Sequence, residues 1–258
     1  MGQHHLVSGT LCRPLVGFLR PAGERVVEIG PGGGTLTREL LATGARRVVG
    51  FELDPAWAFA LRRSLPDPRL ALFVGDALDL GWSRLPPPAL VAGNLPYNVA
   101  TAILERLLPH GDRVPRAAFL VQKEVAERIV ATAGDPAYGS FSVLVACYAR
   151  ATVLGRVRPG SFRPPPKVES AFVGLELHPP PLPPAEMPAF LATVRLAFGQ
   201  RRKTLRNALA AGWGREEAER ALAAAGLPPG ARAERLGLAD LLALHRAAAG
   251  AVLDFIAT

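Results

Sequence analysis

The chain has 258 residues, 49% of them hydrophobic, with two cysteines, Cys12 and Cys147, and a formal net charge of +8; this length suffices for one large core and a smaller second one. No apolar stretch is long enough to span a membrane, and residues 1–20 carry no signal-peptide pattern, so we expect a cytoplasmic protein without a membrane partner. Two cysteines cannot build a disulfide framework or a multi-thiolate zinc site. We also expect a monomer. The excess of basic over acidic residues favours a polyanion such as RNA as a partner, although a coding bias toward arginine accounts for this excess equally well.

The first half of the chain alternates short apolar, β-branched segments with segments of helical periodicity. In chain order, we predict a strand over 25–29, a helix over 35–42, a strand over 47–51, a helix over 55–65, strands over 70–74 and 89–92, a helix over 100–108, a strand over 117–121 and a helix over 124–133. Asp54 and Pro55 form an N-cap and first-turn pair for the second of these helices. Strands that alternate with helices of this length predict an α/β fold with a parallel sheet covered on both faces.

The second half of the chain changes character twice. Strands are predicted over 151–158 and 171–177 with no convincing helix between them, which indicates an antiparallel edge of the sheet. The proline-rich segment 179–184 cannot sustain a helix or a central strand and is typical of a stiff linker. Residues 186–258 are rich in alanine and leucine at helical spacing. We therefore predict a sheet domain over 1–178 and a small all-helical domain over 185–258.

A glycine loop and three acids follow the first three predicted strands, at the edge where open α/β sheets bind ligands. Dinucleotide enzymes also place a glycine loop there, and the three glycines 32–34 allow close approach of a ligand to the backbone. Glu28, two residues before Gly30, would oppose a pyrophosphate but suits the cationic sulfonium and the amino group of S-adenosylmethionine. Glu52 is placed to accept from both ribose hydroxyls and Asp76 from the adenine amine. A nicotinamide oxidoreductase remains the alternative, and each acid alone would equally fit a solvated loop or helix cap.

The segment Asn94-Leu95-Pro96-Tyr97 follows the fourth predicted strand and is the most specific motif in the chain. Methyl transfer to an aromatic amine requires its lone pair to leave the ring conjugation, and acceptors beside the two N–H groups promote this. Asn94 offers a side-chain oxygen, Leu95 a backbone carbonyl and Tyr97 a face for stacking a flipped base, while Pro96 stiffens the turn. Alone, the segment would more readily describe a proline turn with Tyr97 in the core; after the glycine loop and the acids it favours a target-base site.

These residues together resemble the ribosomal RNA adenine dimethyltransferase family. The resemblance extends over nearly the whole chain and rests on Gly2-Gln3-His4-His5-Leu6 and on the segments 27–37, 94–97, 138–140, 162–170 and 198–208. Leu95 and the run 201–206 look more like the small-subunit branch than like the macrolide-resistance branch. His4 departs from the family pattern, because an asparagine normally stands at this position.

The resemblance implies a class I, Rossmann-like methyltransferase domain over 1–178 and a helical RNA-contacting domain over 185–258. It places the cofactor S-adenosylmethionine against His4, Leu6, Gly30, Glu52, Asp76 and Asn94. The full predicted cofactor site adds Glu28, Gly32, Leu53 and Ala77 to these residues. The reacting adenine is expected at Asn94, Leu95, Pro96 and Tyr97, with Phe162 as a second aromatic side chain against it. No metal is expected; His4, His5 and Cys12 are the weak alternative as metal ligands.

The implied activity is dimethylation of two adjacent adenines in a small-subunit ribosomal RNA hairpin within a pre-ribosomal particle. The basic cluster Arg201, Arg202, Lys203 and Arg206 is expected to contact phosphates, with a solvated helix face as the alternative. Two other functions remain open. One is a large-subunit adenine methyltransferase of the macrolide-resistance type, and the other is a ribosome-assembly or transcription factor that keeps the fold without turnover.

Overall fold

The computed structural model describes residues 4–200 and 203–248, which leaves out Gly2, Gln3, Arg201 and Arg202 of the predicted motifs. Contacts divide the chain into two units. One contains the residues up to Glu127 together with Tyr148–Pro179, and the other contains Arg128–Cys147 and the residues from Pro180 onward. No helix in the described ranges is long and apolar enough to cross a membrane.

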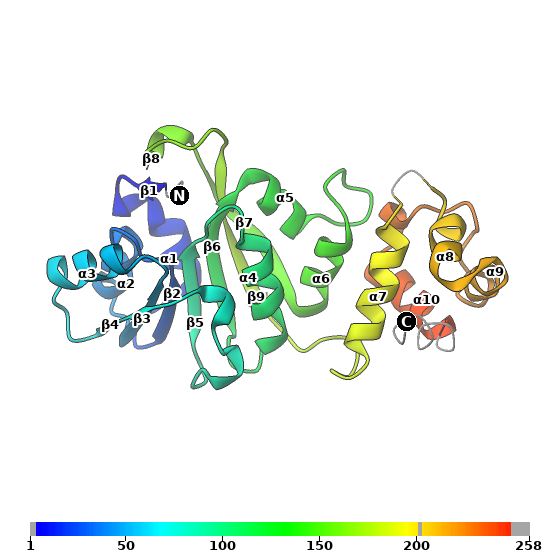
Figure 1. The fold of residues 1–258 in the computed structure, drawn as a ribbon, viewed down its shortest axis with the longest axis horizontal. Helices are drawn as coiled ribbons and strands as arrows, with labels where there is room; N and C mark the ends of the chain where they lie inside the picture. The colour runs from blue at the N-terminus through cyan, green and yellow to red at the C-terminus, as the bar shows by residue number, and fades with distance from the viewer. Residues whose placement is uncertain (1–3, 201–202, 249–258) are drawn as a thin grey trace. The chain divides into compact units, whose positions relative to one another are not determined.

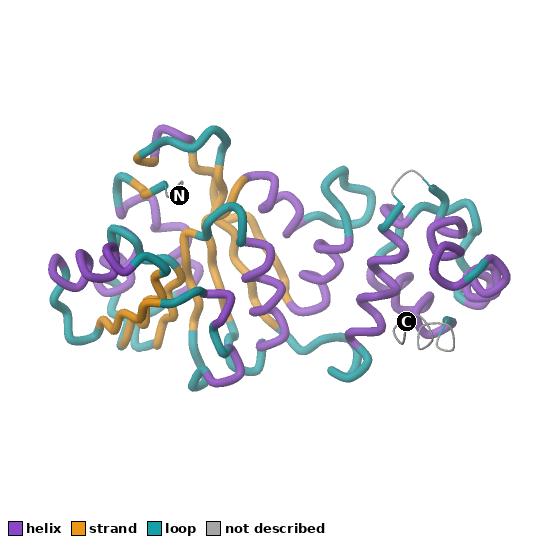
Figure 2. The backbone as a smooth tube through the Cα atoms, in the orientation of Figure 1, coloured by secondary structure: helices purple, strands orange, loops and turns teal. Residues whose placement is uncertain are grey.

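The first unit is built on a seven-stranded sheet with the order β4-β3-β2-β5-β6-β9-β7, drawn in orange in Figure 2. The strands are β2 (Arg25–Ile29), β3 (Arg47–Glu52), β4 (Leu70–Val74), β5 (Leu90–Asn94), β6 (Arg116–Gln122), β7 (Ala149–Val157) and β9 (Ser170–Leu177). Strands β2 to β6 pair in parallel, whereas β9 pairs antiparallel with both β6 and β7. The predicted parallel sheet with an antiparallel edge is therefore confirmed.

Both faces of the sheet are covered, because successive residues of a central strand are buried on opposite sides. Val26 of β2 packs in one hydrophobic cluster with Leu15 and Leu40, which lie on the helices α1 (Arg13–Leu19) and α2 (Thr35–Ala42). Val27, on the other side of the strand, is only 1% exposed. The other helices that begin in this unit are α3 (Pro55–Ser64), α4 (Ala100–Leu107) and α5 (Lys123–Val130) (Figure 1). Asp54 caps α3 as predicted.

Some elements differ from the predicted ones. β5 continues to Asn94 instead of ending at residue 92, because Asn94 still pairs with Leu120 of β6. α5 ends at Val130 rather than at residue 133. The helices α1 and α6 (Ser140–Tyr148) and the short strands β1 (His5–Leu6) and β8 (Phe162–Arg163) have no predicted counterpart. β1 and β8 pair antiparallel with each other, and two residues carry no periodicity that would reveal such a strand.

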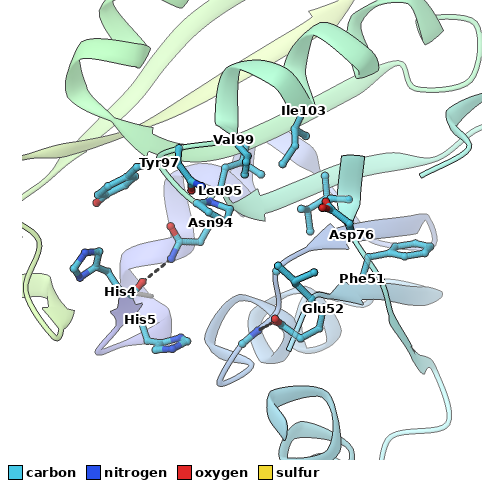
Figure 3. Close-up of a pocket in the computed structure, with 18 residues that line it drawn as sticks. His4, His5, Phe51, Glu52, Asp76, Asn94, Leu95, Tyr97, Val99 and Ile103 are labelled. Atoms are coloured by element: carbon cyan, nitrogen blue, oxygen red, sulfur yellow. Dashed lines mark hydrogen bonds between the residues drawn. The ribbon is translucent and has the colours of Figure 1, made fainter. Parts of the chain in front are cut away.

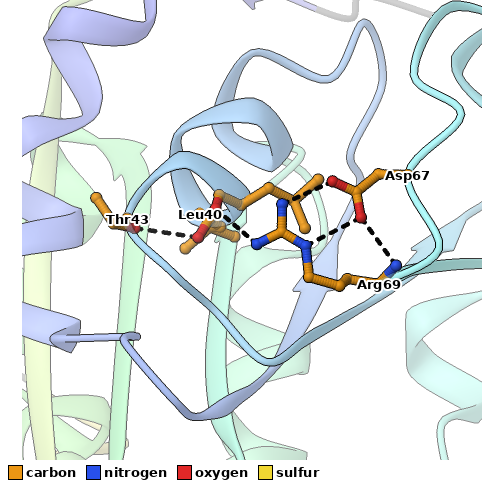
Figure 4. Close-up of polar contacts among 5 residues, drawn as sticks. Leu40, Thr43, Asp67 and Arg69 are labelled. Carbon is orange, nitrogen blue, oxygen red and sulfur yellow. Dashed lines mark hydrogen bonds and ion pairs between the residues drawn. The ribbon is translucent and has the colours of Figure 1, made fainter.

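An ion pair fixes the turn that leads into β4 (Figure 4). Arg69 and Asp67 approach to 2.7 Å, and Arg69 also donates to the carbonyl of Leu41 at 3.1 Å, near the end of α2. The Arg69 guanidinium lowers the pKa of Asp67. Thr43 closes the same helix end by donating to the carbonyl of Leu40 at 3.0 Å. Because partly exposed ion pairs stabilise a fold little, we infer that this one mainly holds the turn before β4 next to the end of α2.

The second unit is all-helical over the residues that the structure describes. After α6 it contains α7 (Met187–Phe198), α8 (Leu205–Trp213), α9 (Arg215–Ala224) and α10 (Leu238–Ala247), which confirms the predicted helical character of the C-terminal region. Tyr138 ties the segment before α6 to these helices, because its hydroxyl donates to the carbonyl of Leu236 at 2.9 Å and its ring meets Phe198 edge-on. Contacts thus group residues 128–147 with the helices, whereas the predicted boundary at 178 assigned them to the sheet domain. The domain assignment stays a prediction.

Candidate active site

A cavity of about 330 Å³ opens at the carboxyl ends of β2, β3, β4 and β5, within the first unit (Figure 3). Parallel strands end at the same edge of a sheet, so residues far apart in the sequence meet there. The lining includes His4, Gly30, Gly32, Glu52, Leu53, Asp76, Ala77, Asn94, Leu95, Pro96 and Tyr97, all of which were predicted for the cofactor or the target base. Three predicted residues, Leu6, Glu28 and Phe162, are not among the lining residues.

The glycine loop between β2 and α2 is held against the cavity by Glu52. Gly30 and Gly32 have φ angles of 66° and 48°, in the left-handed region that glycine adopts without strain. A Cβ on Gly32 would lie 2.6 Å from the ring of His5. The Glu52 carboxylate accepts from the Gly32 N–H at 2.8 Å and from the Asp54 N–H at 3.1 Å. Glu52 therefore shapes the loop as well as lining the cavity.

Asp76 and the residues around it line the cavity after β4. The Oδ1 atom of Asp76 accepts from the N–H of Leu78 at 2.8 Å and so caps the short 3-10 helix Ala77–Asp79. One oxygen of Asp76 therefore serves as a helix cap, which was the alternative to a role in ligand binding. The side chain is nevertheless exposed at the cavity, which leaves its second oxygen for a ligand.

The target-base motif lies where β5 turns into α4. The N–H of Leu95 donates to the carbonyl of Leu120 and extends the sheet by one residue, while the carbonyl of Pro96 accepts from Val99 and starts the turn into α4. Leu95 is buried. The backbone of the motif is therefore held by hydrogen bonds on both sides.

Tyr97 is held by its hydroxyl and by its ring. The hydroxyl lies 2.8 Å from the Oγ atom of Ser170, and burial raises the pKa of Tyr97. The imidazole of His4 stacks on the Tyr97 ring, with centroids 5.7 Å apart and an interplanar angle of 28°. The Nδ2 atom of Asn94 donates to the carbonyl of His4 at 2.8 Å. Asn94 thus lies between His4 and Tyr97 on one side and Glu52 on the other (Figure 3).

Glu28 was predicted to contact the cofactor, but its side chain does not line the cavity. Its side chain is 1% exposed, because it points to the same side of β2 as Val26, where α1 and α2 cover the sheet. Its Oε2 atom and the hydroxyl of Thr37 have no hydrogen-bond partner among the described residues. Burial raises the pKa of Glu28 to about 7; the nearby Thr37 hydroxyl opposes this shift and the charge of Glu52 adds to it. A direct contact with a cofactor is therefore not supported for Glu28.

Phe162 and Leu6 are also packed away from the cavity. Phe162 is 2% and Leu6 7% exposed, and both belong to the hydrophobic cluster of the first unit. They are partners in the β1–β8 pair, and the carbonyl of Leu6 accepts from the hydroxyl of Thr35 at 3.1 Å. The predicted stacking of Phe162 on a base is thus not supported by its position, since it is a core residue of the strand that pairs with β1.

Several lining residues were not predicted, namely His5, Ile29, Phe51, Gly75, Asn98, Val99 and Ile103. Most are neighbours in sequence of predicted residues, and Ile103 lies one helical turn after Val99. His5 reaches the site only because β1 folds back over Gly32; burial lowers its pKa, while Glu52 opposes that shift. The ring of His5 also contacts Trp57, with centroids 4.5 Å apart. Within residues 4–200 and 203–248, no three His, Cys, Asp or Glu side chains form a metal-binding group.

Comparison with known proteins gives relatives over nearly the full chain. A ribosomal RNA small subunit methyltransferase A from Methylococcus capsulatus is 44% identical over 249 residues, which cover 95% of both chains. A protein of the same name from Acidothermus cellulolyticus is 41% identical and covers 95% of this chain and 87% of its own.

Solved structures with the same fold include a dimethyladenosine transferase from Plasmodium falciparum, with a TM-score of 0.79, 23% identity and coverage of 93% of this chain and 96% of its own. The 23S ribosomal RNA methyltransferase ErmE has a TM-score of 0.70 and 28% identity and covers 93% of this chain and 97% of its own. Residues 2–249 match the family described as ribosomal RNA adenine dimethylase. With the cavity, the strand-end residues and the relatives in agreement, this chain belongs to the ribosomal RNA adenine dimethylase family.

Proposed function

We propose that this protein transfers methyl groups from S-adenosylmethionine to the exocyclic amine of adenines in small-subunit ribosomal RNA. The position of Asn94 is the main support for this assignment. Asn94 lines the same cavity as Glu52 and Asp76, which lie on the side expected for a cofactor (Figure 3). Tyr97 lines the side expected for a base. The names of the 44% and 41% identical relatives favour the small subunit over the large one. The finer assignment is dimethylation of two adjacent adenines in a hairpin of a pre-ribosomal particle, by a cytoplasmic monomer.

The residues at the strand ends fit S-adenosylmethionine. Gly30 and Gly32 place bare backbone at the cavity, and the space of about 330 Å³ suits a small cofactor. Each carboxylate oxygen of Glu52 accepts one backbone N–H and retains a further lone pair for a ribose hydroxyl. The second oxygen of Asp76 is available to the adenine amine. When bound, the cofactor supplies a methyl group activated by its positively charged sulfur.

Orientation of the target amine is then the task of this chain's own residues. Asn94 Oδ1 and the Leu95 carbonyl accept from its two N–H groups, which directs the lone pair toward the methyl group. Tyr97 stacks on the flipped base, an interaction worth about 1 to 3 kcal/mol. Positioning of this kind accounts for catalysis without a general base, since the methyl group is already activated.

Methyl incorporation tests the proposed function directly. Small-subunit particles and large-subunit RNA, both prepared from unmodified RNA, are incubated separately with the protein and with cofactor labelled in its methyl group, and labelled nucleotides are mapped. We expect dimethylated adenine at two adjacent positions of the small-subunit RNA. Label in large-subunit RNA instead would indicate the macrolide-resistance type of activity, and RNA binding without any label would indicate a factor that has lost turnover.

Replacing Glu52 with alanine is expected to weaken S-adenosylmethionine binding by about 1.5 to 3 kcal/mol, because charge-assisted bonds to the ribose are removed. The structure adds a second cause, since Gly32 loses the carboxylate that holds its N–H. Calorimetric titration measures the dissociation constant, with Glu105→Gln on the exposed side of α4 as control. A parental dissociation constant for Glu52→Ala would remove this residue from the site.

Replacing Arg201, Arg202 and Arg206 together with alanine is expected to weaken RNA binding and to flatten its salt dependence, by about 0.7 to 0.9 in slope for each phosphate that is no longer neutralised. The first two lie outside the described residues; Arg206 lies 3.5 Å from Glu219 and is 35% exposed. A matched triple variant removes Arg215, Arg220 and Arg232, each of which pairs with a glutamate. Equal slopes for the two triple variants would show that the predicted cluster is a solvated face.

A further inference from the structure

The side-chain amide of Asn94 has a defined orientation in this structure. A backbone carbonyl can only accept, so the atom of Asn94 that faces the carbonyl of His4 at 2.8 Å must be the nitrogen. The Oδ1 atom is then the amide atom that does not contact the carbonyl of His4. This matters for the reaction, because an amide rotated by half a turn would present N–H groups to the N–H groups of the target amine.

His4 is itself held in place by several interactions on the same side of the cavity. Its Nδ1 atom donates to the carbonyl of Pro164 at 2.7 Å, and its ring stacks on Tyr97. The residues that follow pair with β8, and the N–H of Val7 donates to the carbonyl of Ser161 at 3.0 Å. His4 therefore joins three segments that are far apart in the sequence, namely the N-terminal strand, the loop around β8 and the target-base motif.

We propose that His4 is a positioning residue for methyl transfer. Its imidazole anchors it to the carbonyl of Pro164, and its own carbonyl binds the amide nitrogen of Asn94. This contact directs Oδ1 of Asn94 toward the target amine. This inference rests on the proposed function. It assigns a role in orientation to a residue that was predicted only to line the cofactor site. An asparagine at this position would also carry a nitrogen bonded to Cγ that can donate to the same carbonyl.

Three substitutions of His4 separate the contributions of its side chain. His4→Ala removes the bond to Pro164 and the stacking on Tyr97, His4→Asn restores a donor without the ring, and His4→Phe restores a ring without the donor. A matched control is His178→Ala, because the Nδ1 atom of His178 also lies 2.8 Å from a proline carbonyl but outside the site. Thermal unfolding of each full-length variant checks that the fold is retained.

Single-turnover methylation of small-subunit particles, with RNA and cofactor saturating, is the first measurement. We expect His4→Ala to lower the rate about tenfold, as a misplaced acceptor would, and His178→Ala to leave it unchanged. His4→Asn should recover most of the lost rate and His4→Phe should not. The dissociation constant of the cofactor should change less than the rate in all three variants. Recovery by His4→Phe alone would assign the effect to stacking and overturn the proposal, as would a parental rate in His4→Ala.

The side-chain amide resonances of Asn94 provide a measurement that does not depend on activity. They are assigned by their disappearance in the spectrum of Asn94→Ala. We expect His4→Ala to shift them and to speed their exchange with solvent about tenfold, and His4→Asn to restore both, because the hydrogen bond to the His4 carbonyl protects the amide. If the parent protein transfers no methyl group, the proposed function fails while these spectra still decide the geometry. Unchanged Asn94 resonances in His4→Ala overturn the positioning role whatever the rates are.

Discussion

Replacing Asn94 with alanine is expected to lower the rate of methyl transfer about 100-fold to 1000-fold, by analogy with the loss of one positioned donor from an oxyanion hole. The group removed is an acceptor that the structure orients before the base arrives, because the amide nitrogen is engaged by the carbonyl of His4 at 2.8 Å. Without it, the target amine keeps its lone pair in the ring conjugation. The effect should therefore appear in the chemical step rather than in RNA binding.

Single-turnover methylation with saturating RNA measures that step alone. The RNA is supplied in a partly assembled small-subunit particle, which is the substrate that the proposed function implies. Cofactor affinity is measured by calorimetric titration. Asn94 is also expected to contact the cofactor, but Glu52 and Asp76 remain, so the affinity should fall far less than the rate. If Asn94→Ala methylates adenine at the parental rate, the motif is a structural turn and the mechanism proposed above is wrong.

Tyr97 provides the contrast to Asn94. Tyr97→Ala should mainly weaken the hold on the flipped base and spare much of the cofactor affinity, because the stacking face is removed. Tyr97→Phe is the matched variant, since it keeps the ring and removes only the hydroxyl that lies 2.8 Å from Ser170. We expect Tyr97→Phe to stay close to the parent protein. A similar loss in both variants would assign the role of Tyr97 to its hydroxyl.

The parts of the site that follow strand ends could be predicted from the sequence. A short β-branched run followed by glycines, an acid or a proline turn is a local signal, and parallel pairing brings such strand ends together whatever lies between them. Glu52, Asp76 and Asn94 were found in this way, and all three line the cavity. The extension of β5 to Asn94 was not predicted, because an asparagine carries no strand signal and its pairing with Leu120 is a long-range interaction.

The parts that depend on folding back across the site could not be predicted. β1 and β8 are two residues long and are separated by most of the sheet domain, so that only the tertiary structure creates their pairing. Phe162 was expected beside the base for its aromatic ring, but this pairing turns it into the core next to Leu6. His5 was not predicted to line the cavity for the same reason.

Glu28 shows how the side of a strand limits a prediction made from position alone. A carboxylate two residues before the glycine loop is close to the cavity along the chain, and the charge argument for a cationic ligand depends only on this proximity. Successive side chains of β2 point to opposite faces of the sheet, so Glu28 faces the helices whereas Ile29 and Gly30 line the cavity. Burial beside Glu52 then raises the pKa of Glu28 to about 7.

This raised pKa predicts that the contribution of Glu28 to the free energy of unfolding falls as the pH rises from about 4.5 to about 7. In this range Glu28 holds a proton in the folded chain but not in the unfolded chain, so the unfolded state binds fewer protons and the free energy of unfolding falls with pH. At 1.36 kcal/mol for each pKa unit, the contribution of this one group is about 3 kcal/mol. Below 4.5 and above 7 its contribution no longer changes, because both states carry the same charge there.

Glu28→Gln removes the ionisable group and keeps the shape of the buried side chain. We expect the free energy of unfolding of Glu28→Gln, relative to the parent protein, to increase by about 3 kcal/mol between pH 4 and pH 8. Urea denaturation without cofactor, at closely spaced pH values, gives both curves, and the difference between them cancels the titration of all other groups. Glu105→Gln, an exposed substitution on α4, should follow the parent curve. A Glu28→Gln curve parallel to that of the parent across this range would mean that Glu28 ionises in the folded protein as it does in the unfolded chain.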